Sequence, residues 1–173
     1  GNISVELLDG HTGRVLSDAS RLAAMSSACA LLDICLPERE PYPNLFASLK
    51  ALLLVLPDEG WEGAYVAWEL SLLAELGFGL DLSACAATGV TENLIYVSPK
   101  SGRAVSAEAG EVYRDKLLPL PRFLLGNAAS DSNSLGEGLR LTGYFLERHV
   151  LSPHGHLLPD ARSRIAPRPL HNL

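Results

Sequence analysis

Apolar residues recur at intervals of three and four along the first half of the chain, and this spacing predicts amphipathic helices. The first helix is expected between a cap at Ser17 or Asp18 and about Leu36. Its inward face would consist of Leu22, Met25, Cys29, Leu32 and Leu36. The second helix is expected over residues 45–56, behind an N-cap at Asn44. It would bury Leu45, Leu49, Leu52, Leu53 and Leu56.

A third helix is expected over residues 61–76, where Gly77 ends it. Its inward side would consist of Tyr65, Trp68, Leu72, Leu73 and Leu76, which fit a core better than a binding site. A last long helix is expected to start at a capping box formed by Ser134 and Glu137. Its apolar residues are Leu135, Leu139, Phe145, Leu146 and Val150. Helices joined by short connections predict a mainly α fold, a helical bundle.

A small β-hairpin interrupts the helical pattern. Residues 94–97 and 103–105 read as short strands around a Ser-Pro-Lys-Ser-Gly turn at 98–102, within a module spanning 81–106. Ser106 is expected to cap a short helix from Ala107 to about Leu117. The sequence therefore places a hairpin module between the third helix and the last one.

The two ends of the chain differ from the central part, residues 18–152. Residues 2–8 alternate polar and apolar, as a strand does, although no partner strand follows. Residues 1–17 are either a trimmed terminus or the last strand and linker of a larger β-domain. Residues 153–173 contain four prolines and few apolar residues, which predicts a weakly ordered tail.

Composition favours a globular protein in a reducing compartment. The chain is 47% hydrophobic and 20% charged, and it has no apolar run of membrane-spanning length and no secretory signal pattern at its start. Its three cysteines are too few and odd in number for a disulfide scaffold. We therefore expect a cytoplasmic protein that does not contact a membrane.

Charge is distributed unevenly along the chain. Residues 1–98 hold 4 Lys or Arg against 13 Asp or Glu, a net of −9, whereas residues 99–173 hold 10 against 7, a net of +3. The two halves add to the overall −6. Because distant charges are screened at physiological salt, a basic half can still attract phosphates locally. Scattered solvated charge explains the distribution equally well.

The hairpin module has the spacing of a four-ligand zinc knuckle without the ligands. Positions 85 and 88 and positions 106 and 109 stand as two Cys-x-x-Cys pairs would. Only Cys85 is a thiol, since the others are Thr88, Ser106 and Ala109. A lone thiolate does not hold tetrahedral zinc, so no metal and no other cofactor is expected.

Catalysis has no candidate constellation in the sequence. His149, His154 and His156 are close together but lack a carboxylate at useful spacing, which favours a surface cluster over a metal site. The chain has neither a Gly-x-Ser-x-Gly elbow nor a glycine-rich phosphate loop. We therefore expect a binding protein rather than an enzyme.

Four segments resemble the RecO family of recombination mediators. They are WELSLLAELGFGLDL at 68–82 followed by Cys85 and Gly89, YVSPKSGRAVS at 96–106, LLPLP at 117–121 and YFLERHVL at 144–151. The resemblance spans about residues 1–165 and is closest to the zinc-free branch, because the family's four-cysteine form has ligands at the positions named above. It implies a RecO-like C-terminal helical domain over 18–152, with only the final strand of the family's N-terminal OB-fold in residues 1–17.

The resemblance also implies partners. RecO proteins bind single- and double-stranded DNA, anneal complementary strands, engage the tail of single-strand binding protein, and act with RecR to load RecA in the bacterial cytoplasm, at the nucleoid. For phosphate contact we favour Lys100 and Arg103, because a tight turn projects both outward. Further DNA-binding candidates are Arg114, Lys116, Arg122, Arg140 and Arg148, with Arg162, Arg164 and Arg168 in the tail. The alternative is a helical protein-interaction domain that touches no nucleic acid.

Overall fold

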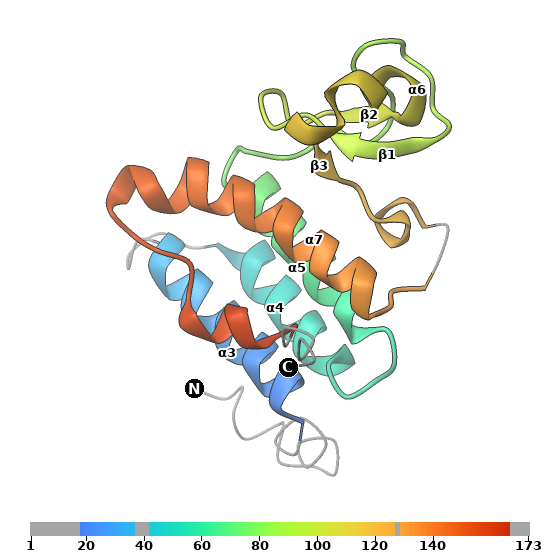
Figure 1. Cartoon of the computed structure of the whole chain (residues 1–173). Coiled ribbons are helices and arrows are strands. Elements are labelled where there is room, and N and C mark those ends of the chain that lie inside the picture. The colour runs from blue at the N-terminus through green and yellow to red at the C-terminus, as the bar shows by residue number, and fades with distance from the viewer. Residues whose placement is uncertain (1–17, 37–41, 127–128, 167–173) are drawn as a thin grey trace, which may run out of the picture.

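The computed structural model describes residues 18–36, 42–126 and 129–166. Within these ranges a layered group of helices carries a small antiparallel sheet at one end (Figure 1). The expected fold class, a mainly helical bundle with a small β-module, is confirmed. The expected strand and linker at 1–17 lie outside the described residues.

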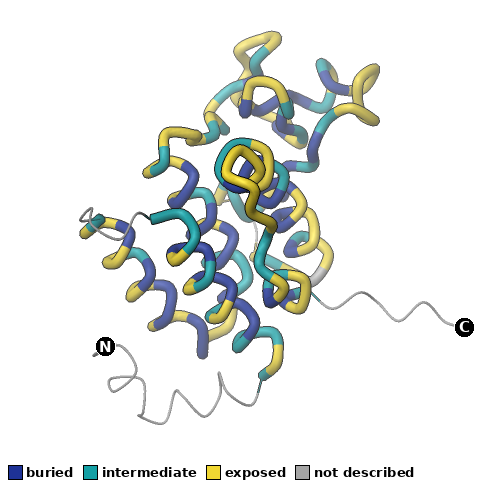
Figure 2. The backbone as a smooth tube through the Cα atoms, turned by 90° about the vertical axis from the view of Figure 1, so that its left-hand side faces the viewer, coloured by how far each residue is buried: buried dark blue, intermediate teal, exposed yellow. Residues whose placement is uncertain are grey.

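Helix α5 (Trp61–Glu75) is the centre of the bundle, with α4 (Pro43–Val55) packed on one side and α7 (Ser132–Phe145) on the other (Figure 1). Burial follows the predicted apolar spacing closely in α4 and α5, where one face of each helix is solvent-excluded (Figure 2). The five leucines expected to be buried in the second helix are all buried, as are Tyr65, Trp68 and Leu72 of α5.

Helix α3 (Ala19–Cys35) begins as expected, because the Asp18 carboxylate accepts hydrogen bonds from the backbone N–H groups of Ser20 and Arg21 at 2.9 and 3.2 Å. Its predicted inward face is right for Leu32, which is buried, but wrong for Cys29, which is exposed, and only half right for Leu22, Met25 and Leu36, which are half-buried. The buried residues are instead Ala23, Ala24, Ser27, Ala28, Leu31 and Leu32. Small side chains line this face because α3 packs closely against a C-terminal segment as well as against α5.

Two helix starts differ from the sequence expectation. Helix α4 begins at Pro43 and its N-cap is Tyr42, so Asn44 lies inside the helix. Proline is favoured at the first helical position because its missing N–H would have no partner there. Helix α7 is capped by Asp131, and its capping partner is Ser134 rather than Glu137. In both cases a residue slightly earlier in the chain than expected starts the helix.

The β-module contains the predicted hairpin and one further strand. Strands β1 (Leu94–Val97) and β2 (Ala104–Ser106) pair antiparallel, with Val97 opposite Ala104. Strand β3 (Leu118–Pro119) pairs with the other edge of β1 and was not predicted, because two residues are too few to show alternation. Helix α6 (Ala107–Gly110) follows β2, and its Ser106 hydroxyl accepts a 3.2 Å hydrogen bond from the Ala109 N–H as expected. The α-helix is shorter than expected, because it ends at Gly110 and the chain continues as a 3₁₀ helix over Glu111–Lys116 instead of reaching Leu117 as α-helix.

The expected weakly ordered tail is wrong for residues 153–166. After a π-helical turn (Leu146–Leu151) and a short 3₁₀ turn (Ser152–His154), the chain runs back along α3 and forms a 3₁₀ helix, η5 (Asp160–Arg164) (Figure 1). Ala161 and Ile165 are buried against the bundle. The prolines break regular helix without preventing this packing. Residues 167–173 lie outside the described residues.

Candidate nucleic-acid interface

The hairpin turn presents the two cations that the sequence favoured. Within the turn, Gly102 N–H donates to the Ser98 carbonyl and Ser98 N–H donates to the Arg103 carbonyl, both at 2.9 Å. Gly102 has a φ of +67°, and a Cβ at this position would lie 3.0 Å from a Leu80 methyl group. This tight turn leaves Lys100 and Arg103 exposed, which confirms the predicted orientation of their side chains.

Arg103 has an acidic neighbour. Asp81 forms a backbone bridge with the residues around Arg103, donating to the Gly102 carbonyl at 3.0 Å and accepting from Ala104 N–H at 2.9 Å. Hydrogen bonds from the Ser83 hydroxyl and N–H lower the pKa of Asp81, and the charge of Arg103 lowers it further. Because both side chains are exposed, water screens their attraction and leaves Arg103 accessible to other anions.

Two more predicted cations meet where the β-module joins α7. A pocket of about 440 Å³, here called the junction pocket, has Lys116, Arg140 and Pro99, the neighbour of Lys100 in the chain, on its lining. Its other lining residues are Asp115, Leu117, Leu118, Leu139, Gly143, Tyr144, Glu147, Leu158 and Arg162. The pocket therefore combines apolar residues with charges of both signs.

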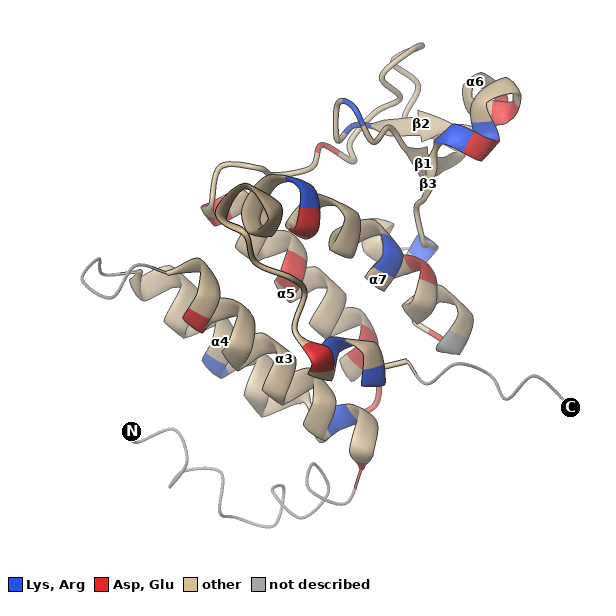
Figure 3. Ribbon diagram, turned by 60° about the vertical axis from the view of Figure 1, so that its left-hand side comes forward, with Lys and Arg blue, Asp and Glu red and all other residues tan. Residues whose placement is uncertain are grey.

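The remaining predicted cations are dispersed. The Arg114 guanidinium lies 3.4 Å from the Glu111 carboxylate in an exposed pair. Arg122 lines a separate pocket of about 340 Å³ together with Asn93. Arg148 is exposed in the π-helical turn and does not line the junction pocket. Basic residues thus occur at the hairpin turn, beside α6 and along α7, interspersed with acidic ones (Figure 3).

Arg162, which the sequence suggested as a phosphate-binding candidate, is largely buried in the fold. Its guanidinium donates to both oxygens of Glu69, through Nε at 2.8 Å and Nη2 at 2.9 Å, and to the Leu139 carbonyl at 2.6 Å. Glu69 is fully buried and also accepts from Thr142 Oγ1 at 2.5 Å. Burial by itself lowers the pKa of Arg162, but the charge of Glu69 and the hydrogen bonds to it, with smaller contributions from Tyr65 and Glu147, together outweigh burial and raise the pKa. Arg164 remains exposed, and Arg168 lies outside the described residues.

Tyr65 extends this buried network to α3. Its hydroxyl donates to Glu69 Oε2 at 2.9 Å and lies 2.7 Å from the Ser27 hydroxyl. Burial, and then the charge of Glu69, raise the pKa of Tyr65 well above its usual value. The network joins α3, α5, α7 and η5. The one sequence signal that could have indicated this network is the charged residue Glu69 within the apolar spacing of α5.

Hydrogen bonds hold the knuckle-like module together around Cys85. The buried Cys85 sulfur accepts a 3.3 Å hydrogen bond from the N–H of Ser106, so the two degenerate ligand pairs do meet in space. Burial raises the pKa of Cys85, but the Thr88 hydroxyl and the N–H groups of Ser106, Thr88 and Ala87 outweigh burial and lower it to about 6. In the described part of the chain, no three His, Cys, Asp or Glu side chains are grouped to hold a metal ion.

The three histidines share one surface hollow. His149, His154 and His156 line a pocket of about 430 Å³ with Cys35 and Phe78. The His149 and Phe78 rings are stacked, with centroids 5.2 Å apart and planes at 12°. The three histidines are therefore close together in the structure. They lie where α3, α5 and the π-helical turn end, and the partial negative charge of helix C-termini disfavours anion binding there.

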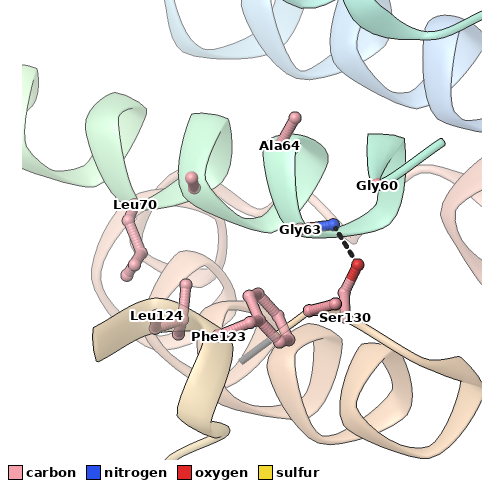
Figure 4. A pocket seen from close by; sticks show the side chains of 9 residues that line it. Gly60, Gly63, Ala64, Leu70, Phe123, Leu124 and Ser130 are labelled. Carbon is pink, nitrogen blue, oxygen red and sulfur yellow. Dashed lines mark hydrogen bonds between the residues drawn. The ribbon is translucent and has the colours of Figure 1, made fainter. Parts of the chain in front are cut away.

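A further pocket, of about 370 Å³, is uncharged. Small residues of α5 form one wall, and Phe123, Leu124 and Ser130 form the other (Figure 4). The Gly63 N–H donates to the Ser130 hydroxyl at 3.2 Å across this pocket (Figure 4). Because no lysine or arginine lines it, this pocket does not suit an acidic ligand.

Comparison with known proteins supplies the family. Residues 16–158 match the model of the recombination protein O C-terminal region. The chain is 51% identical over 170 residues to the DNA repair protein RecO of Rhodospirillum centenum, covering 97% of this chain and 68% of that one. It is 51% identical over 176 residues to RecO of Rhodospirillum rubrum (97% and 70%) and 49% identical over 166 residues to RecO of a Jannaschia species (95% and 68%). No solved structure matches significantly. The matched residues cover the bundle and the β-module together, and on this agreement the chain belongs to the RecO family.

Proposed function

We propose that this chain is a DNA repair and recombination mediator that binds single- and double-stranded DNA. Membership of the RecO family, whose similar members carry the name DNA repair protein, is the observation that supports this role most directly. The exposed cations at the hairpin turn and at the junction pocket are consistent with it. They are Lys100, Arg103, Lys116 and Arg140.

The proposed binding is electrostatic and local. Each cation that neutralises a phosphate releases condensed counterions, so the affinity falls as the salt concentration rises. Glu147 and Asp115 in the junction pocket, and Asp81 beside the turn, oppose this attraction. We therefore expect weak binding by this chain, at low salt, with no sequence preference.

The finer activities of the proposed role are strand annealing and, together with RecR, the loading of RecA on single strands coated by single-strand binding protein. They belong to a binding protein of the bacterial cytoplasm, associated with the nucleoid, rather than to an enzyme. None of the helices in the described ranges has the length and apolarity needed to cross a membrane.

A titration of labelled single strands and duplexes at increasing salt tests the proposal. Lys100→Glu combined with Arg103→Glu should weaken the binding of both forms, because it reverses two phosphate-facing charges. Lys50→Glu, an exposed position on α4, is the matched control and should leave the affinity unchanged. Absence of binding at low salt would favour the alternative, a helical protein-interaction domain without nucleic-acid contact.

The junction pocket favours a second binding activity. The tail of single-strand binding protein is acidic and apolar, and such a tail suits an apolar groove with cations at its rim. Leu117, Leu139 and Leu158 supply apolar lining, and Lys116 and Arg140 supply positive charge. We propose this pocket as the site for the tail. A tail peptide should bind, and a peptide whose terminal acidic residues are replaced by their amides should bind more weakly.

A further inference from the structure

One short element of the β-module presents apolar side chains to water. The 3₁₀ helix η1 (Glu111–Lys116) has no buried residue. Val112 is 85% exposed and Tyr113 is 59% exposed, and the two are adjacent. Single exposed apolar residues are ordinary on protein surfaces, but a contiguous pair held outward on a fixed element is a candidate contact site. We call Val112 and Tyr113 the apolar knob.

Both ends of η1 are fixed to β1. At its start, Gly110 lies against the Tyr96 ring, so closely that a Cβ at Gly110 would lie 2.4 Å from Tyr96 Cδ2. At its end, Leu118 in β3 pairs with Val97. The knob is therefore presented by a pinned turn, and little conformational entropy is lost when it makes a contact.

Two cations follow the knob on the same element. Arg114 follows Tyr113 directly, and Lys116 reaches the junction pocket, where Arg140 also lies. The same element also carries two acidic residues, Glu111 and Asp115. The Arg114–Glu111 pair is 3.4 Å long with both side chains about two-thirds exposed, and pairs of this kind contribute little. A phosphate can thus replace Glu111 as the partner of Arg114 at small cost.

Exposed aromatic rings beside cations are what proteins use to hold single strands, because bases stack on the rings while cations follow the phosphates. We propose that Tyr113, supported by Val112, stacks an unpaired base of single-stranded DNA, with Arg114 and Lys116 on the adjoining phosphates. This inference rests on the proposed DNA binding, and it adds that this part of the chain prefers single-stranded to double-stranded DNA. Bases in a duplex are already stacked and hide their faces, so the knob contributes only to single-strand affinity.

The test compares Tyr113→Ala and Tyr113→Phe in the 173-residue chain, by fluorescence anisotropy with a labelled thymidine 20-mer and with a labelled hairpin duplex. Loss of the ring should lower the single-strand affinity by about 5- to 100-fold. Tyr113→Phe, which retains a stacking face, should stay within about 3-fold of the parent. Phe46→Ala, which removes a 53% exposed aromatic ring from α4, is the matched control and should change nothing.

Two further readouts separate stacking from other roles. Because Tyr113 is uncharged, its removal should leave the salt dependence of single-strand binding unaltered, and duplex affinity should be unaffected. Photocrosslinking with an iodouracil-substituted strand should label Tyr113, identified by mass spectrometry. Unchanged single-strand affinity in Tyr113→Ala, while Lys100→Glu with Arg103→Glu weakens binding, would overturn the stacking site and leave the proposed function standing. An equal loss for single strands and duplexes, or a loss confined to the tail peptide, would also overturn it. If the parent chain binds no DNA, the proposed function and this inference fail together.

Discussion

Arg162 and Glu69 form a two-point ion pair inside the bundle although 93 residues separate them in the chain. The pair is joined by Thr142, whose hydroxyl donates to Glu69 and accepts from Arg162 at 3.1 Å. It fastens the returning segment around η5 to α5 and α7. The same Arg162 side chain lines the junction pocket, so this buried network contributes to the lining of the proposed partner site.

Replacing Arg162 by alanine should destabilise the protein strongly. It would leave the fully buried Glu69 carboxylate without its cation, and breaking a buried pair in this way costs about 3–5 kcal/mol. Chemical denaturation followed by circular dichroism measures the loss. Arg164→Ala, two residues along and exposed, is the control and should change the free energy of unfolding by less than about 0.5 kcal/mol.

A double variant distinguishes the effect of the ion pair on stability from the effect of packing the segment around η5. Replacing both members with apolar residues, as in Glu69→Leu with Arg162→Met, removes the unpaired charge as well as the attraction. This double variant should be more stable than Arg162→Ala, because the desolvation cost of the two charges disappears with them. Equal stability of the two variants would mean that the ion pair has no special role.

Local sequence signals predicted the helices better than the faces they bury. All five expected leucines are buried, four in α4 and Leu56 at its C-cap, because α4 packs one apolar stripe against the neighbouring helix α5. In α3 the apolar spacing pointed to Met25 and Cys29, yet the buried stripe contains Ala24 and Ala28. The partner of that stripe is η5, which lies more than 120 residues away and carries prolines nearby. A long-range contact of this kind leaves no periodic trace in the sequence.

The candidate interface was predictable only in part, because local sequence patterns indicate turns but not long-range contacts. The turn chemistry of residues 98–102 is local, so the exposure of Lys100 and Arg103 followed from it. The meeting of Lys116 with Arg140 depends on how the β-module sits on α7, which no local pattern encodes. The exposure of Tyr113 was also missed, because a tyrosine within a short helical pattern looks the same whether it faces a core or water.

Asp131 should be the residue on which the start of α7 depends. Its carboxylate accepts a 2.7 Å hydrogen bond from the Ser134 N–H, and the Ser134 hydroxyl accepts one of 2.7 Å from the Asp131 N–H. Asp131→Ala should cost about 1 kcal/mol in the free energy of unfolding. Glu137→Ala should cost less than about 0.5 kcal/mol, because Glu137 is an exposed residue outside the capping box. If Glu137→Ala cost more than Asp131→Ala, the capping box of Ser134 and Glu137 that the sequence predicted would be the correct one.

The same cap predicts a pH dependence. Hydrogen bonds from the Ser134 N–H and hydroxyl lower the pKa of Asp131 in the folded protein below its ordinary value of 3.8. The stabilisation is therefore present above that value and is lost as the pH falls through the lower, folded pKa. The stability difference between the parent and Asp131→Asn should shrink between about pH 5 and about pH 2. A difference that stays constant over this range would contradict a role for the ionised carboxylate.

The knuckle-like module should accept zinc once its ligands are restored. The Ser106 N–H already lies 3.3 Å from the Cys85 sulfur, and Ala109 follows Ser106 at Cys-x-x-Cys spacing. Thr88→Cys, Ser106→Cys and Ala109→Cys together should create a four-thiolate site that binds one Zn²⁺ per chain, measured by metal analysis and by the cobalt charge-transfer spectrum. Adding Cys85→Ala to this variant should weaken the binding, and no uptake by the triple variant would show that the four thiolates do not reach a tetrahedral arrangement around one ion.

The two proposed binding sites should respond differently to charge changes. Lys116→Gln with Arg140→Gln should weaken the binding of both DNA and the acidic tail peptide. Lys100→Gln with Arg103→Gln should weaken the binding of DNA alone, since the turn residues do not line the junction pocket. For single strands, each pair should reduce the slope of log affinity against log salt by about 1.4, from about 0.7 per phosphate contact. Neutralising the opposing acids, by Asp115→Asn with Glu147→Gln, should strengthen tail binding because both carboxylates line that pocket. Isothermal titration with the peptide measures this gain. A loss of affinity instead would mean that the two carboxylates hold Lys116 and Arg140 in place rather than repel the ligand.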